Sequence, residues 1–249
     1  MKKLLCLALA VMMIFTLAAC GGEKAENTLK IGYTIYEPMN YMDGDKLTGF
    51  DTEFSEAVCA KLGLTPEFIE INWDTKFVTL DAKQIDCIWN GMTISDEVKA
   101  NCDVSKAYVK NAQVVVMKKD AIDNYKDAES LKGLKFAAEA GSAGEAAIKD
   151  NGLDANYAPV AAQTDALLAV IGGQADACVI DITMAKSMTA EGTSYDSLGY
   201  SIELTSEEYG IGFRKGDELT EKVNKAIDEL KADGTLDALA EKYGLNLAL

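Results

Sequence analysis

The chain has 249 residues, of which 49% are hydrophobic and 26% are charged, a composition typical of a globular protein with one or two domains. It contains no histidine, which excludes histidine-dependent catalytic triads and histidine zinc sites. The formal net charge of −16 makes nucleic acid an unsuitable partner, because binding phosphates needs clustered basic residues.

The first twenty residues have the pattern of an export signal. A basic start at residues 1–3 is followed by the apolar run 4–17 and by small residues up to Cys20. An apolar run of 14 residues is too short to span a membrane, which takes roughly 20 residues. Residues 17–20 (LAAC) resemble a bacterial lipoprotein signal. We therefore expect residues 1–19 to be removed, Cys20 to carry lipid, and residues 20–27 to form a polar tether.

Four further cysteines lie at positions 59, 87, 102 and 178. They are far apart and show no CxxC spacing, so a zinc site is not expected. Either they are small buried hydrophobic residues, as free cysteines often are, or one pair, such as Cys87 with Cys102, forms a disulfide.

Short apolar runs alternate with amphipathic segments from residue 28 onward. The sequence predicts strands at 29–33, 64–71, 85–89, 112–118, 134–138, 157–160 and 175–180. It predicts helices at 51–62, 75–83, 95–99, 145–151, 164–171 and 183–189, and two more that end at Gly234 and Gly244. Such alternation is typical of βαβ units in parallel sheets. Because the pattern occurs twice, we expect two α/β lobes with a ligand site in the cleft between them.

Several motifs of chemical interest are incomplete. The loop 43–48 (DGDKLT) begins like a calcium loop but has Thr48 where the glycine is required. The loop 141–144 (GSAG) lacks the Lys-Ser/Thr of a phosphate loop and the spacing of a nucleophile elbow. We therefore expect no metal, no cofactor and no enzymatic activity.

Other positions suit a small ligand. Tyr36 and Trp73 each follow a predicted strand, where an aromatic ring can stack on a ligand or simply pack in the core. The loops 90–93 and 141–144 offer backbone N–H groups to an anion, although both can also be helix caps. Asp181 ends a strand and can pair with an ammonium group or cap the next helix. Glu139 can favour a cationic ligand or be a solvated acid.

The same regions resemble the polar amino-acid-binding family (family 3) of bacterial extracellular solute-binding proteins, the capture subunits of ABC uptake systems. The resemblance is carried by residues 31–39, 47–51, 85–95, 173–181, 209–216 and 232–236, in that order along the chain. It implies a two-lobed, periplasmic-binding-protein-like (type II) α/β fold with a two-strand hinge. Residues 28–111 and 209–249 would form the first lobe, and residues 112–208 the second.

The resemblance also implies roles for single residues. Tyr36 and Trp73 would flank the ligand side chain, and Asn90, Gly91 and Thr93 would hold its backbone groups. Ser142 and Ala143 would bind the α-carboxylate, and Asp181 the α-amino group.

The sequence departs from the family pattern at Val98, where the family usually has an arginine that binds the α-carboxylate; the only arginine, Arg214, lies in another motif. The carboxylate would then depend on N–H groups, Thr93, Ser142 or a lysine such as Lys76. The early acid that often binds a basic side chain is Thr34 here, whereas Glu139 favours a cation, so the sequence does not identify the amino acid.

The function expected from the sequence is capture of an amino acid or close analogue by a monomeric lipoprotein. It would be exported, anchored through Cys20 to the outer face of the cell membrane, and would deliver its ligand to an ABC permease. Two alternatives are a sensing lipoprotein that signals through a receptor and a dehydratase-like enzyme on the same fold.

Overall fold

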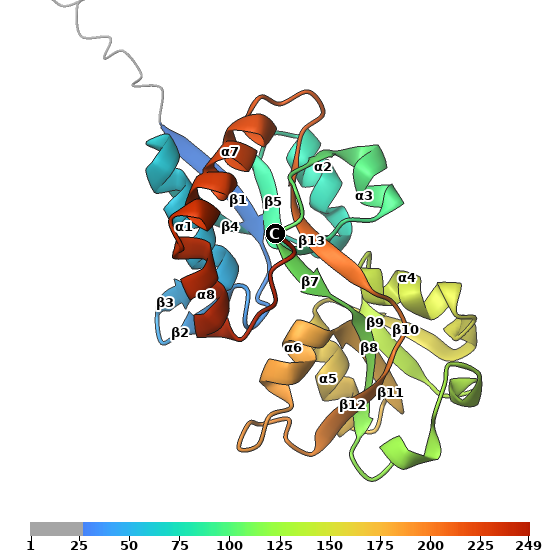
Figure 1. Ribbon diagram of the computed structural model, residues 1–249. Coiled ribbons are helices and arrows are strands. Elements are labelled where there is room, and N and C mark those ends of the chain that lie inside the picture. Colours follow the sequence, from blue (N-terminus) through green and yellow to red (C-terminus); the bar gives the residue numbers. More distant parts are fainter. Residues whose placement is uncertain (1–26) are drawn as a thin grey trace, which may run out of the picture.

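The computed structural model describes residues 27–249 and contains two large sheets, each covered by helices, and a third sheet of two short strands (Figure 1). The predicted signal segment, Cys20 and the tether up to residue 26 lie outside the described residues. We call the two large sheets with their helices the first and the second lobe. This two-lobed α/β architecture agrees with the predicted fold class. None of the described helices is both long and apolar enough to cross a bilayer.

The first lobe is built on a sheet with the strand order β4-β1-β5-β13-β6, and β7 also pairs with β13. Its strands are β1 (Thr28–Tyr33), β4 (Thr65–Glu70), β5 (Cys87–Thr93), β6 (Asp103–Val104), β7 (Val109–Asn111) and β13 (Glu207–Phe213). Its helices are α1 (Phe50–Leu62), α2 (Lys76–Asp81), α3 (Asp96–Asn101), α7 (Leu219–Ala232) and α8 (Thr235–Tyr243), with a 3₁₀ turn at Trp73–Thr75. A small hairpin of β2 (Tyr41–Asp43) and β3 (Lys46–Thr48) precedes α1.

The second lobe has the strand order β10-β9-β11-β8-β12. Its strands are β8 (Gln113–Lys118), β9 (Phe136–Glu139), β10 (Tyr157–Val160), β11 (Ala177–Asp181) and β12 (Leu198–Glu203). Its helices are α4 (Ala143–Asp150), α5 (Gln163–Ile171) and α6 (Ile182–Met188), with 3₁₀ turns at Ile122–Asn124, Glu129–Leu131 and Asp154–Asn156.

The core of the first lobe explains why these helices form where they do. Phe54 and Val58, one turn apart on α1, are fully buried, and the Phe54 ring meets the Trp89 ring of β5 edge-on with centroids 5.1 Å apart. On α7, Val223 and Ile227 are buried at the same spacing. Figure 1 shows α1, α7 and α8 on one face of the first sheet, and α2 and α3 on the other. Strand β5 is therefore covered on both faces.

The chain passes between the lobes in two adjacent segments. One joins β7 to β8 through residue 112, and the other joins β12 to β13 through residues 204–206. The two segments are hydrogen-bonded to each other: Gln113 N donates to Thr205 Oγ1 at 2.9 Å, and Leu204 N donates to Gln113 O at 2.8 Å. Such a pair of strands is typical of a hinge.

The expectation of parallel sheets is only partly correct. Strand β13 runs antiparallel to β5, and β8 runs antiparallel to both β11 and β12. Parallel neighbours need a crossover connection, usually a helix. Strands β8 and β13 instead enter their sheets directly from the other lobe, and they therefore run in the opposite direction.

All four cysteines of the described chain are buried free thiols, so the alternative of a Cys87–Cys102 disulfide is not realised. Arg214 is also engaged away from the cleft. Its guanidinium donates to Ile85 O at 2.6 Å and to Asp86 Oδ1 at 3.0 Å, which ties the end of β13 to the start of β5.

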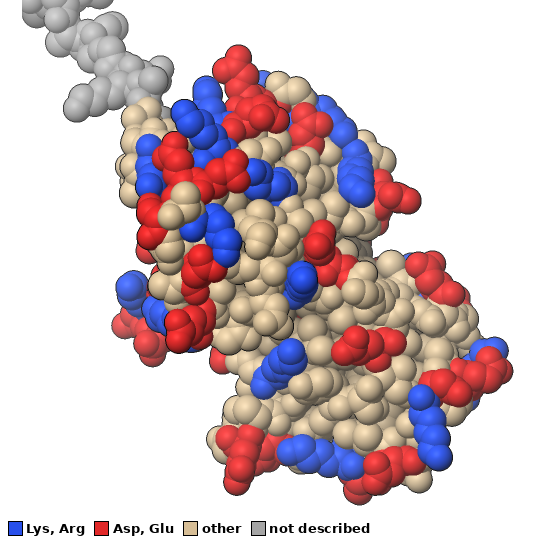
Figure 2. Space-filling model, in the orientation of Figure 1, with Lys and Arg blue, Asp and Glu red and all other residues tan. Residues whose placement is uncertain are grey.

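Basic and acidic side chains are intermixed on the face of the molecule drawn in Figure 2, instead of forming a continuous basic area. Several of them form exposed ion pairs, such as Lys242 with Glu53 at 2.6 Å and Lys61 with Asp233 at 2.8 Å. Exposed pairs of this kind add little to stability. Because the charges on that face are mixed, it offers no basic area to which a polyanion could bind.

Candidate functional site

A cleft between the two lobes contains every residue that the sequence singled out for ligand binding. About 200 Å³ of its interior is open to water-sized molecules. The residues from the first lobe are Tyr36, Trp73, Asn90, Gly91 and Thr93, and those from the second are Glu139, Ser142, Ala143 and Asp181. These positions are up to 145 residues apart in sequence, and the two-lobed fold brings them to one place.

The floor of the cleft in the first lobe is formed by the end of β5. Gly91 has a φ of +55°, and a Cβ atom there would lie 2.6 Å from a carbon of the Tyr36 ring, so only glycine fits. The Gly91 N–H, which we expected to be free for a ligand, is donated to Asp51 Oδ2 at 2.6 Å. Burial raises the pKa of this Asp51 carboxyl to about 7.

The Asn90 side chain is also used within the protein. Its amide donates to Asn40 Oδ1 at 2.7 Å and to Thr34 O at 2.9 Å, and its oxygen accepts from the Thr34 hydroxyl at 2.7 Å. Asn90 therefore lines the cleft but holds the neighbouring loop in place. It has no side-chain donor left over for a ligand.

One wall of the cleft carries two carboxylates, from Asp181 at the end of β11 and Glu207 at the start of β13. Asp181 is 6% exposed and accepts hydrogen bonds from Gln113 Nε2 at 2.9 Å, Gln163 Nε2 at 2.6 Å and the Tyr209 hydroxyl at 2.8 Å. Although Asp181 precedes α6, its side chain makes no capping hydrogen bond to that helix. Burial, together with the nearby Glu207 charge, raises the pKa of Asp181 to about 7.

Thr93 is connected to this acidic wall. Its hydroxyl donates to Glu207 Oε1 at 2.7 Å, and Gln113 Nε2 donates to the same oxygen at 2.8 Å. A second acid at the cleft was not predicted. The sequence feature that could have indicated Glu207 is its position two residues before the Tyr209-Gly210 motif. No strand was predicted for that segment.

The second lobe contributes the N-terminus of α4. Ser142 is its N-cap, with the hydroxyl accepting from Glu145 N at 3.2 Å, and Gly141 N donates to Glu145 Oε2 at 2.7 Å. The two bonds resemble a capping box, except that Glu145 accepts from the residue before the N-cap. Ala143 is the first helical residue, where backbone N–H groups have no partner within the helix and favour an anion. Ser142 is thus both a cap and part of the cleft wall.

Lys76 connects the lobes beside this helix end. Its Nζ donates to Gly141 O at 2.8 Å and lies 5.0 Å from the centre of the Trp73 ring. Lys76 is 4% exposed, and burial lowers the pKa of its ammonium group. Among the described residues it is the one basic side chain that lines the cleft.

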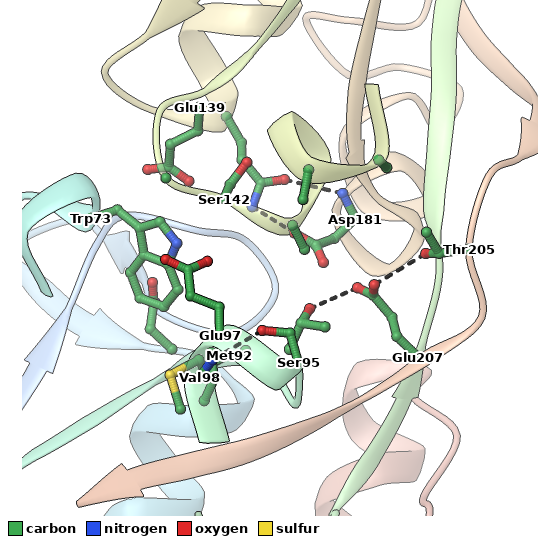
Figure 3. A pocket seen from close by; sticks show the side chains of 18 of the residues that line it. Trp73, Met92, Ser95, Glu97, Val98, Glu139, Ser142, Asp181, Thr205 and Glu207 are labelled. Atoms are coloured by element: carbon green, nitrogen blue, oxygen red, sulfur yellow. Dashed lines mark hydrogen bonds between the residues drawn. The ribbon is translucent and has the colours of Figure 1, made fainter. Parts of the chain in front are cut away.

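Val98 lies on α3. Ser95 is the N-cap of this helix, and its hydroxyl oxygen accepts a hydrogen bond from Val98 N at 3.1 Å. The valine is buried and lines the cleft together with Met92. This part of the wall is therefore apolar. Figure 3 shows it below Trp73 and Glu97, with Glu139 above them and with Asp181 and Glu207 on the opposite side.

Glu139 differs from the solvated acid that was one alternative. It is 4% exposed, and its Oε1 has no hydrogen-bond partner among the described residues. Burial and the Asp181 charge raise the pKa of this carboxyl to about 8, while Lys76 acts in the opposite direction.

Comparisons with known proteins agree with this architecture. The family described as bacterial extracellular solute-binding proteins, family 3, matches residues 29–246. The arginine-binding extracellular protein ArtP of Bacillus subtilis is 32% identical over 255 residues, which cover 98% of each chain. The L-cystine-binding protein TcyJ of Escherichia coli is 33% identical over 224 residues, covering 88% of this chain and 84% of its own.

A solved structure shares the fold as well. An ancestral arginine-binding protein bound to arginine is 34% identical and superposes with a TM-score of 0.82, covering 87% of this chain and 98% of its own. Because the family match extends over nearly the whole described chain, this protein belongs to family 3 of the bacterial extracellular solute-binding proteins.

Proposed function

We propose that this protein captures an amino acid in the cleft between its lobes and, as a monomer, delivers it to the permease of an ABC importer. The observation that supports this most strongly is the polarity of the cleft. One wall carries the acids Asp181 and Glu207, and the other carries the N-terminus of α4 with Lys76. A zwitterion, with one ammonium and one carboxylate group, matches that arrangement.

In this proposal Asp181 and Glu207 bind the α-ammonium group, and Thr93 lies next to them. The α-carboxylate is held by the Ser142 hydroxyl, by the N–H group of Ala143 and by the Lys76 ammonium group, which takes the place of the arginine absent at position 98. A charge-assisted hydrogen bond of this kind contributes about 1.5–3 kcal/mol.

Tyr36 and Trp73 are proposed to flank the ligand side chain. Both rings line the cleft, and Trp73 is 8% exposed. A ring on each side adds contact area with little loss of side-chain entropy. The Tyr36 hydroxyl also bonds to Thr183 and Tyr209, so the ring is fixed before a ligand arrives.

Binding without chemistry is part of the proposal. A ligand that touches both lobes stabilises the closed arrangement through its differential affinity, and the hinge segments allow the lobes to separate again. The relatives named above are binding proteins for arginine or cystine, which supports capture of an amino acid.

A thermal-shift screen of the twenty amino acids with the purified full chain tests the function. A ligand at one hundred times its Kd should stabilise the folded state by about 2.7 kcal/mol and raise the midpoint accordingly. The variant Asp181→Asn should show no such shift, whereas Asp154→Asn, an exposed residue in the 3₁₀ turn Asp154–Asn156 that does not line the cleft, should respond as the wild type does. If no amino acid moves the wild-type midpoint, the proposed function is wrong.

We also propose that lipid on Cys20 anchors the protein to the outer face of the cell membrane. The net charge of −16 would not hold it on an anionic bilayer, so the lipid has to supply the attachment. In cells, Cys20→Ser should release the protein from the membrane fraction. Unchanged membrane association of the variant would contradict the anchor.

A further inference from the structure

The strongest unexplained feature of the cleft is the buried carboxylate of Glu139, the last residue of β9. Its Oε1 has no hydrogen-bond partner in the described part of the chain, and the side chain is 4% exposed. An ionised carboxylate without a partner in such a place is strongly disfavoured. The group must therefore stay protonated or meet a cation that comes from outside the protein.

Lys76, the one basic residue lining the cleft, is the candidate for an internal counter-ion, but two of its three N–H donors are used by backbone carbonyls. Its Nζ donates to Gly141 O at 2.8 Å and to Trp73 O at 3.3 Å, and it lies 4.8 Å from the centre of the Phe77 ring. No hydrogen bond or ion pair joins Lys76 to Glu139 within residues 27–249. The Lys76 charge therefore favours ionisation of Glu139 from a distance, but Lys76 does not form an ion pair with it.

The charge balance of the cleft points the same way. Five acidic residues line it, at positions 97, 139, 150, 181 and 207, against the single basic residue Lys76. A zwitterion with a neutral side chain has no net charge and leaves the acidic excess of the cleft in place. A ligand with a second positive charge reduces that excess.

The positions of the acids are as informative as their number. In Figure 3, Asp181 and Glu207 lie on one side of the cleft, and Glu139 lies on the other, near Trp73 and Glu97. A ligand whose ammonium group meets Asp181 would extend its side chain toward Trp73 and Glu139. There a cation would find a carboxylate and the face of an aromatic ring, two partners that favour it.

We propose that the ligand is a cationic amino acid, with a side-chain ammonium or guanidinium group, and that Glu139 binds this second positive charge. The inference rests on the proposed function, because it takes the α-ammonium and α-carboxylate positions from there. Glu139 then determines specificity, while Asp181 and Lys76 bind the groups common to all amino acids.

Calorimetric titration of the full chain at pH 7.5 with two matched pairs tests the proposal. L-arginine is compared with L-citrulline, which has the same length and no charge, and L-lysine with L-norleucine. In the wild type the cationic member of at least one pair should bind at least tenfold more tightly than its neutral partner. In Glu139→Gln this ratio should fall below about threefold, with the affinity for the neutral partner unchanged or higher.

Glu208→Gln is the matched control, because Glu208 carries the same charge but is exposed and does not line the cleft. Its ratio should stay within about twofold of the wild-type ratio, since solvent screens an exposed charge. A wild type that prefers the neutral partners, or a Glu139→Gln variant that keeps the full preference for the cation, would overturn the inference while leaving amino-acid binding intact. If none of the twenty amino acids binds, the proposed function itself fails.

Discussion

Gln113 Nε2 donates to both cleft acids, to Asp181 Oδ1 at 2.9 Å and to Glu207 Oε1 at 2.8 Å. Asn111 Nδ2 donates to the same two oxygens. The acids belong to different sheets, and the shared amides lie on either side of one hinge crossing, between β7 and β8. Two acidic side chains are therefore held together by neutral donors, and the Glu207 charge disfavours ionisation of Asp181.

Glu207→Gln should weaken amino-acid binding and change its pH dependence. The variant keeps an oxygen for Thr93 and Gln113 but loses the charge, so we expect affinity to fall about tenfold to a hundredfold. Because the Glu207 charge contributes to the raised pKa of Asp181, that pKa should fall in the variant. The pH midpoint of binding, followed by calorimetry from pH 5 to 9, should therefore move to lower pH.

Glu208→Gln is the control for this prediction. Glu208 is the next residue on β13, is exposed and does not line the cleft. Its affinity and pH midpoint should match those of the wild type. If Glu207→Gln and Glu208→Gln behave alike, Glu207 is not part of the ammonium site.

Lys76→Met should remove the preference for a ligand carboxylate. The Lys76 ammonium group lies beside the N-terminus of α4, bonded to Gly141 O at 2.8 Å, and methionine keeps its length without its charge. We compare the amino acid that binds most tightly with the amine that lacks its carboxylate. The wild type should prefer the amino acid, and the variant should lose at least about tenfold of that preference, since a charged hydrogen bond is lost.

Lys99→Met provides the comparison, because Lys99 is an exposed lysine on α3 and does not line the cleft. It should keep the wild-type ratio. An undiminished preference for the carboxylate in Lys76→Met would mean that the backbone N–H groups of α4 hold this group without the lysine.

Trp73→Ala should weaken ligand binding by roughly 1–3 kcal/mol, and Trp73→Phe by less, if the ring stacks on the ligand. Fluorescence gives a direct readout because the chain has two tryptophans and the other, Trp89, is fully buried in the core of the first lobe. The emission change on ligand addition should disappear in Trp73→Phe. If that change persists, the ligand does not reach Trp73.

The strands and helices that follow one another locally were predictable from the sequence, because each βαβ unit alternates apolar runs with capped helices. Strand β13 was not predicted. Its sequence, EEYGIGF, contains two glycines, which are usually unfavourable in strands. They are needed here because a Cβ at Gly210 would lie 2.6 Å from Val104, and one at Gly212 would lie 2.8 Å from Met92. Such close packing depends on the tertiary structure and leaves no local signal.

The positions of the cleft residues were predictable, but some of their contacts were not. Tyr36, Trp73 and Asp181 follow strands whose ends meet at the cleft, and the family resemblance gave the same positions. The sequence could not show that the Gly91 N–H is taken by Asp51 or that the Asn90 amide is taken by Asn40. Gln113, Gln163 and Glu207 were missed because they are single polar residues on separate elements, and only the folded chain brings them together.

The pH dependence of stability should reflect the buried acids. The pKa values of Asp51 and Asp181 are raised to about 7 and that of Glu139 to about 8, against ordinary values near 4, chiefly by burial. Between about pH 4 and pH 8 the folded protein keeps protons that the unfolded chain releases. The free energy of unfolding of the ligand-free protein should therefore fall as the pH rises through this window.

Glu139→Gln isolates one part of this effect. Glutamine has nearly the same shape and no charge, so near pH 5, where Glu139 is protonated, the variant and the wild type should have similar thermal midpoints. At pH 9 the wild type has to bury an ionised carboxylate whose surroundings include Lys76, Asp165 and Asp181, and the variant does not. The variant should then be more stable by about 1–3 kcal/mol, the usual cost of a buried unsatisfied group. Glu97→Gln, which removes an exposed charge, should have the thermal midpoint of the wild type at both pH 5 and pH 9. If Glu139→Gln also matched the wild type at both pH values, Glu139 would not ionise inside the folded protein.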